Sequence, residues 1–172
     1  MQFRRALVLD RGVGGLTTAH RLLRSDWEVL LTGPSPSRGK LETLSGAGLQ
    51  AARRLGLPST GLLTALSCLV KVPTAPDVRS RVPDDCGVTV TFADGTEDWF
   101  DLVVDADWGR GDVSLAIFGA ELLGDAFDIH HDTAEALRWW NRTMLSHQRR
   151  RPLSRRRRGY RVVAADRVRS RG

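Results

Sequence analysis

Three glycines near the start of the chain have the spacing of a phosphate-binding turn. Gly12, Gly14 and Gly15 follow the apolar run at 6–9 and precede a helical pattern at 16–23. In a strand–turn–helix unit, such glycines let the backbone approach a pyrophosphate, and the helix N-terminus presents free N–H groups to it. The order of these segments therefore predicts a dinucleotide-binding turn.

Two positions depart from this pattern. The first glycine of G-x-G-x-x-G falls at residue 10, which is Asp10. A side chain there predicts a strain of roughly 1–2 kcal/mol if the backbone needs a positive φ, and its carboxylate would oppose a diphosphate unless Arg11 screens it. The second strand, at 27–32, ends at Gly33 where an acidic residue would hold a ribose. We therefore expect a weakened nucleotide site.

The elements around this turn follow from local patterns. Alternation around Asp94-Gly95 predicts a hairpin with arms at 88–92 and 96–104, and the prolines of 73–83 indicate a linker. The pattern predicts helices at the following places: 16–23 with Leu16, Ala19, Leu22 and Leu23 inward, 49–55 ending at Gly56, one from Ser114, and one from Asp132 with Leu137, Trp140 and Met144 inward.

Charge is distributed unevenly along the chain. The formal net charge is +6, but residues 149–172 carry eleven arginines and one aspartate, so the first 148 residues are slightly acidic. We expect one domain over 1–148 and a basic, disordered tail over 149–172. The tail would contact polyanions non-specifically, although the sequence shows no nucleic-acid-binding motif.

The two cysteines indicate the compartment. Cys68 and Cys86 have no C-x-x-C spacing, which is typical of reduced thiols in a cytoplasmic protein. No apolar run reaches the length of a membrane span, and the first residues lead into a strand rather than a signal peptide. We expect a cytoplasmic location and no membrane contact.

No metal site is predicted. The histidines of His130-His131-Asp132 are adjacent, and adjacent histidines rarely converge on one ion. Asp132 and Glu135 have the spacing of a helix capping box instead. No Ser/His/Asp or Cys/His spacing singles out a catalytic residue, so the catalytic residues stay unknown.

Several segments in this order resemble the FAD-dependent monooxygenases of the aromatic-hydroxylase type. The matching segments are 6–9, 12–16, 55–57, 88–97, 101–107 and 114–117. The resemblance implies an α/β fold with a Rossmann-like FAD/NAD(P)-binding core, a β-hairpin and C-terminal helices. The spans at 70–88 and after 107 are short for the family's substrate-binding sheet, so we expect that sheet to be largely missing.

The resemblance also implies site residues and cofactors. Gly12, Gly14 and Gly15 would face the FAD pyrophosphate, Arg38 would reach a flavin phosphate or ribose, and Asp107 would approach the cofactor from its strand end. Arg38 reads equally well as a solvated loop residue. FAD is the implied cofactor and NAD(P)H the implied electron donor, while the small-molecule substrate is not identified.

Two functions stay open on these grounds. The first is a FAD-binding oxidoreductase of monooxygenase type, weak or inactive on its own, which the glycine turn and the hairpin support. The second is a non-enzymatic remnant or interaction module with a dead nucleotide site. Asp10, Gly33 and Trp108, which stands where the family has a glycine, favour the second.

Overall fold

The computed structural model describes residues 4–34, 43–106, 113–149 and 161–164. Within these residues the chain forms helices and strands in the order β1 (Arg4–Val8), α1 (Val13–Leu23), β2 (Trp27–Leu31), α2 (Gly46–Arg54), α3 (Leu62–Leu69), β3 (Val78–Pro83), β4 (Val88–Phe92), β5 (Glu97–Phe100), β6 (Leu102–Asp105), α4 (Val113–Ile129), α5 (Thr133–Arg149) and β7 (Arg161–Ala164).

The strands form two sheets. The first has the order β2-β1-β6-β7, in which β1 runs parallel to both β2 and β6, and β7 pairs antiparallel with β6. The second is the antiparallel sheet β3-β4-β5. β7 lies within the basic segment 149–172, and the sequence analysis did not anticipate this strand.

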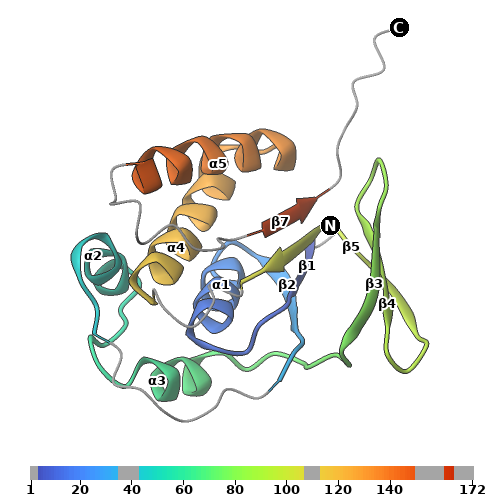
Figure 1. Ribbon diagram of the computed structural model, residues 1–172, viewed down its shortest axis with the longest axis horizontal. Helices are drawn as coiled ribbons and strands as arrows, with labels where there is room; N and C mark the ends of the chain where they lie inside the picture. Colours follow the sequence, from blue (N-terminus) through green and yellow to red (C-terminus); the bar gives the residue numbers. More distant parts are fainter. Residues whose placement is uncertain (1–3, 35–42, 107–112, 150–160, 165–172) are drawn as a thin grey trace, which may run out of the picture.

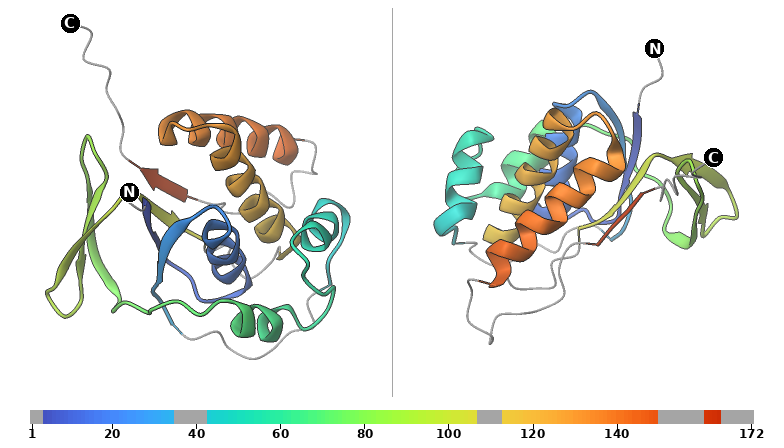
Figure 2. Two further views of the ribbon diagram at one scale, coloured as in Figure 1. Left: turned by 180° about the vertical axis from the view of Figure 1, so that it is seen from behind. Right: turned by 90° about the horizontal axis from the view of Figure 1, so that it is seen from above.

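The four-stranded sheet is the middle of three layers (Figures 1 and 2). Alternate residues of β1 point to opposite faces. Ala6 and Val8 belong to the larger core, shared with helices such as α1 and α4, whereas Leu7 joins Val103, Val90 and the other residues packed under β3–β5. The apolar residues of β1 and β6 are therefore buried on both faces of the sheet, as expected for strands covered on both sides.

The hairpin is confirmed, but its second arm divides. β4 and β5 pair around the turn at Gly95, whose φ is +85°. The chain then bends at Asp101, and β6 leaves the hairpin to pair with β1. The expected linker at 73–83 is wrong in its second half, because Val78–Pro83 is β3 and pairs with β4.

Two predicted helix ends have the hydrogen bonds that the sequence indicates. Gly56 has a φ of +71°, its N–H donates to the Arg53 carbonyl, and the Leu57 N–H donates to the Ala52 carbonyl. This is the Schellman arrangement that ends many helices at glycine. At the start of α5, the Glu135 N–H donates to Asp132 Oδ1 over 2.8 Å, which confirms the Asp132 cap.

The inner faces of the helices are largely as predicted. Trp140 is buried and its indole N–H donates to the Gly119 carbonyl over 3.0 Å, which satisfies the one polar group of this side chain. The prediction that Leu23 faces inward is wrong, because 36% of this residue is exposed. Leu23 is the last residue of α1, so no further turn of the helix covers it.

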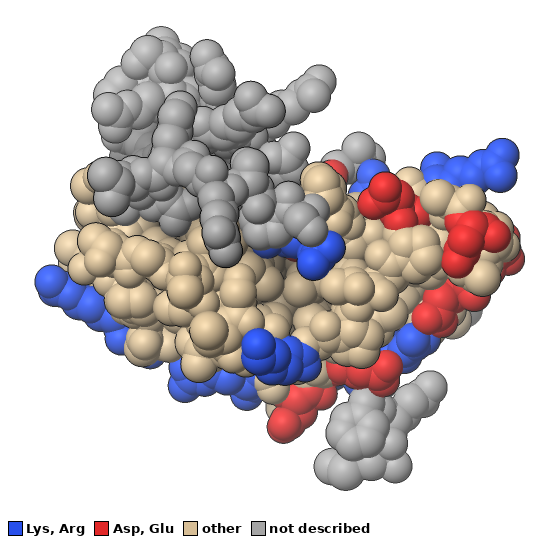
Figure 3. All heavy atoms as spheres, turned by 90° about the horizontal axis from the view of Figure 1, so that it is seen from below, with Lys and Arg blue, Asp and Glu red and all other residues tan. Residues whose placement is uncertain are grey.

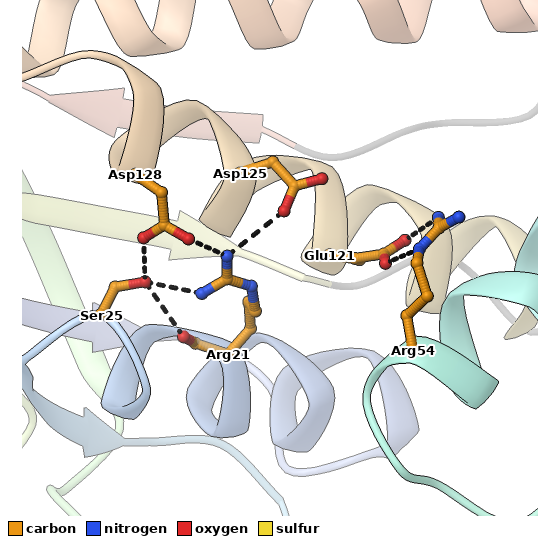
Figure 4. A network of polar contacts seen from close by, with 6 residues as sticks. All are labelled: Arg21, Ser25, Arg54, Glu121, Asp125 and Asp128. Atoms are coloured by element: carbon orange, nitrogen blue, oxygen red, sulfur yellow. Dashed lines mark hydrogen bonds and ion pairs between the residues drawn. The ribbon is translucent and has the colours of Figure 1, made fainter.

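Ion pairs that each have one buried partner join α4 to its neighbours (Figure 4). Arg21 on α1 is 8% exposed and donates to Ser25 Oγ over 2.7 Å and to Asp125 and Asp128 on α4. Nearer the start of α4, on the same face of this helix, the Arg54 guanidinium donates two hydrogen bonds to the Glu121 carboxylate. Polar side chains therefore fix the position of α4 beside α1 and α2.

A third cluster joins β1 to the hairpin. The Arg5 guanidinium donates to both carboxylate oxygens of Asp98, over 2.7 and 2.8 Å, and its backbone N–H donates to Asp101 Oδ2 over 2.7 Å.

Exposed acidic side chains gather on the side of the molecule where β3–β5 lie (Figure 3). Among the described residues, no helix is both long and apolar enough to cross a bilayer.

Candidate functional site

The carboxyl ends of the three parallel strands meet at one edge of the sheet, where α1 also begins. Leu9, directly after β1, donates its N–H to the Val104 carbonyl of β6 over 2.8 Å. Thr32, directly after β2, donates its N–H to the Val8 carbonyl over 3.0 Å. In open α/β sheets this edge is where ligands bind, so the glycine turn at 10–15 lies in the expected place.

The Asp10 carboxylate occupies the inside of this turn. Its Oδ1 accepts a hydrogen bond from the Gly12 N–H over 2.8 Å, and its Oδ2 accepts one from the Gly15 N–H over 2.9 Å. Gly12 is the N-cap of α1 and Gly15 lies in its first turn. The carboxylate therefore satisfies N–H groups at the helix N-terminus, and its negative charge is favourable there.

The strain expected at Asp10 is absent. Among the described residues other than glycine, Asp26 alone has a positive φ, of 58°. The side chain of Asp10 is accommodated because it folds back onto the turn that follows it, in the manner of an Asx turn. The departure from the glycine pattern adds hydrogen bonds here rather than backbone strain.

Gly15 is the glycine that the packing requires. A Cβ built on Gly15 would lie 2.0 Å from the Asp10 carbonyl oxygen, so no side chain fits between the helix and the end of β1. A Cβ on Gly12 would lie 3.2 Å from the Asp10 carboxylate oxygens, which belong to a side chain that can shift. Gly15 thus performs the helix–strand packing role of the third fingerprint glycine.

Gly33 lies beside Asp10 at this edge of the sheet. Its φ is +108°, a backbone conformation that favours glycine, and a Cβ there would lie 3.9 Å from the Asp10 Cα. An acidic residue at this position, which would hold a ribose in nucleotide-binding folds, would adopt this backbone only with strain. The structure therefore gives a backbone reason for the lost acidic residue.

An open groove of about 370 Å³ adjoins the turn, between the end of β2 and strand β3. It is lined by Leu9, Thr32, Gly33, Pro34 and residues 77–81. Arg79 and Arg81 contribute two cations to this lining, and Arg81 Nη1 lies 4.0 Å from Asp105 Oδ2 at the end of β6. The groove is within the size range of small-molecule sites.

The predicted site residues fall into two groups. Gly12, Gly14 and Gly15 come together in the turn at the carboxyl edge, whereas Arg38 and Asp107 lie outside the described residues, as does Trp108. Sequence reasoning missed Arg81, since it assigned 73–83 to a linker. The alternation of Val78, Ser80 and Val82 was the available indication of a strand.

Solved structures resemble the fold of this chain. The chain matches the crystal structure of the tetracycline destructase Tet(51) with a TM-score of 0.51 and 20% identity over 59% of this chain, and that of the tetracycline destructase Tet(55) with a TM-score of 0.50 and 17% identity over 59%. Klebsiella pneumoniae HpxO complexed with FAD and uric acid matches with a TM-score of 0.48 and 19% identity over 58% of this chain and 38% of its own.

The chain has the FAD-binding monooxygenase fold. This confirms the predicted fold class, an α/β core with a hairpin and C-terminal helices. The chain spans 37% of the length of each tetracycline destructase that it matches. Searches against protein-family models and against curated protein sequences found no match.

The turn in this conformation does not fit the pyrophosphate of FAD. The N–H groups of Gly12 and Gly15 already donate to Asp10. The Asp10 carboxylate also places a negative charge at the helix N-terminus, where the negative charge of a diphosphate would lie. A pyrophosphate would have to displace this side chain before it could use the same donors.

Proposed function

We propose that this chain is a FAD-binding oxidoreductase domain of monooxygenase type, with weak affinity for FAD and no turnover on its own. The fold and the glycine turn at the carboxyl edge support FAD as the ligand. The observation that carries the weak affinity is the pair of hydrogen bonds from Gly12 and Gly15 to Asp10, because FAD must compete with them.

The lack of turnover is proposed from the open surroundings of the turn. Flavin oxygen chemistry needs a site that excludes water. The groove next to the turn is open. The described residues form two sheets, and they include no third sheet that could cover the groove. Arg79 adds a cation to this groove, but Arg81 is paired with Asp105 and Asp77 adds a carboxylate. These side chains do not enclose the groove. A second protein or domain would have to supply the enclosure.

A FAD titration of the purified chain tests this proposal. Flavin fluorescence and visible absorbance are recorded at rising protein concentration, and NADH and NADPH oxidation are then measured at saturating flavin. We expect perturbed flavin bands only at high micromolar concentration, with NAD(P)H oxidation no faster than free FAD gives. Protein that is yellow as purified contradicts the weak affinity, and turnover above free FAD contradicts the lack of activity.

The second candidate is an interaction module with a closed nucleotide site. Asp10 and Gly33 favour it, because Asp10 occupies the N–H donors of the turn and Gly33 supplies no carboxylate to hold a ribose. Unperturbed FAD fluorescence at millimolar FAD, with circular dichroism showing a folded chain, would reject the FAD-binding proposal in favour of this one.

A further inference from the structure

We infer that Asp10 is an internal substitute for a bound phosphate, and that this one carboxylate determines whether the glycine turn accepts a phosphate-bearing ligand. The inference rests on the proposed function in one respect, since the turn is where the FAD pyrophosphate would lie. It goes further because it assigns the exclusion of phosphate-bearing ligands to one side chain, which a substitution can remove.

The chemistry of the carboxylate matches that of the group it replaces. A phosphate at a helix N-terminus accepts hydrogen bonds from backbone N–H groups and is stabilised by the helix dipole. The Asp10 carboxylate is also an anion, and its two oxygens accept from Gly12 and Gly15 over 2.8 and 2.9 Å. An external phosphate and this carboxylate therefore compete for the same donors.

The covalent attachment of Asp10 gives it the advantage in this competition. Asp10 is itself the first residue of the turn at 10–15, so its carboxylate binds without the loss of translational freedom that an external ligand undergoes. Its charge would also repel a diphosphate that approached from the groove. Removal of the carboxylate frees both donors and removes one negative charge.

The rest of the turn would remain usable after this removal. Gly15 keeps its close contact with the Asp10 carbonyl oxygen, a backbone contact that Asp10→Gly does not alter. The Gly12 backbone is extended, with φ of −77° and ψ of −171°, and does not depend on the carboxylate for an unusual conformation. Asp10→Gly would also restore the first glycine of the fingerprint.

The test compares wild-type protein with Asp10→Gly, using inorganic pyrophosphate and FAD as two separate probes. Binding is followed by thermal melting and by calorimetric titration. Pyrophosphate should raise the Tm of Asp10→Gly and leave that of the wild type unchanged. FAD should bind Asp10→Gly about tenfold tighter than wild type or better, as expected for the release of charge-assisted hydrogen bonds.

Asp84→Gly is the matched control. Asp84 accepts hydrogen bonds from the Cys86 and Gly87 N–H groups, each over 2.7 Å, in the loop between β3 and β4. This substitution removes the same kind of interaction at a place remote from the turn. It should lower the Tm slightly and leave the binding of both probes at the wild-type level.

The possible results distinguish a failure of the inference from a failure of the proposed function. If Asp10→Gly binds pyrophosphate but not FAD, the inference stands and the proposed function fails. If folded Asp10→Gly binds neither probe more tightly than the wild type, the inference is overturned. Wild-type protein that binds FAD as tightly as Asp10→Gly would uphold FAD binding and overturn the inference.

A measurement on the wild type covers the case in which Asp10→Gly does not fold. The backbone amide resonances of Gly12 and Gly15 are assigned by NMR, and pyrophosphate is then added. We expect both amides to exchange slowly with solvent and to keep their shifts, because Asp10 holds them. Shifts of these two resonances at millimolar pyrophosphate would overturn the inference.

Discussion

Arg54 on α2 and Glu121 on α4 form an ion pair in which the two partners differ strongly in exposure. The side chain of Glu121 is 6% exposed and that of Arg54 is 58% exposed. Two guanidinium hydrogen bonds reach the carboxylate (Figure 4), and this contact raises the pKa of Arg54 above its usual value. The buried Glu121 carboxylate therefore receives its charge compensation and two hydrogen bonds from one largely exposed cation.

Arg54→Met should therefore cost more stability than a surface substitution. It removes the cation and both hydrogen bonds while Glu121 stays buried, so we expect a loss of about 2–3 kcal/mol in the free energy of unfolding. Arg53→Met, at the exposed neighbouring position of α2, should change it by less than about 0.5 kcal/mol. Urea unfolding monitored by circular dichroism measures both.

The double variant Arg54→Met/Glu121→Met distinguishes the contribution of the ion pair from the effect of each substitution on its own helix. With both charges removed, an apolar contact can replace the ion pair, and most of the loss should be recovered. Equal losses for Arg53→Met and Arg54→Met, or no recovery in the double variant, would show that Glu121 is adequately solvated without Arg54.

Gly15→Ala should disrupt the core of the nucleotide-binding fold. The new Cβ would lie 2.0 Å from the Asp10 carbonyl oxygen and 2.6 Å from its carbonyl carbon, so α1 would have to move away from β1. We expect a loss of about 3 kcal/mol, at the upper end of overpacking effects. Thermal and urea unfolding measure this loss.

Gly12→Ala provides the comparison within the same turn. Its Cβ would meet only the movable carboxylate of Asp10, at 3.2 Å, so a loss of about 1 kcal/mol or less is expected. If the two alanine variants were equally stable, the close approach of α1 to β1 would not be a constraint on the fold.

Features determined by neighbouring residues could be predicted from the sequence. The turn at Asp94-Gly95, the helix end at Gly56 and the cap at Asp132 each depend on residues within a few positions of one another, and the structure confirms all three. The parallel strand β1 was also recognisable, because its apolar residues Ala6, Leu7 and Val8 follow one another and are buried on both faces of the sheet.

Features that depend on distant residues could not be predicted in this way. β3 contains exposed residues and ends at Pro83, and it is a strand because β4 pairs with it. The segment 96–104 was predicted as one hairpin arm, yet β6 leaves the hairpin since β1 offers a buried parallel partner. Sequence reasoning recognised Asp10 as a departure from the pattern but not as an acceptor for Gly12 and Gly15.

Asp132→Ala should weaken the start of α5. The Asp132 carboxylate accepts the Glu135 N–H over 2.8 Å, and loss of an N-cap side chain costs about 1 kcal/mol. Hydrogen exchange of the Glu135 amide should accelerate together with the fall in stability. Glu135→Gln keeps the cap and should retain this protection, whereas equal exchange rates in both variants would contradict the capping role.

The Arg5–Asp98 pair should make stability sensitive to acid. The Arg5 guanidinium, through its hydrogen bonds to the carboxylate, lowers the pKa of Asp98 below its usual value near 3.8. A lowered pKa in the folded state means that the pair stabilises the fold above about pH 4 and that this contribution is lost as the pH falls through the folded-state pKa. Because about a third of the Asp98 side chain is exposed, the contribution at pH 7 should be about 1 kcal/mol or less.

Asp98→Asn tests this dependence when its unfolding free energy is compared with that of the wild type from pH 7 to pH 2.5. The difference should be constant at neutral pH and shrink toward zero below about pH 4, since protonated Asp98 and asparagine are both neutral. Asp85→Asn, at an exposed position in the loop between β3 and β4, should follow the wild-type profile. A difference between Asp98→Asn and wild type that stays the same down to pH 2.5 would mean that the charge on Asp98 does not stabilise the contact between β1 and β5.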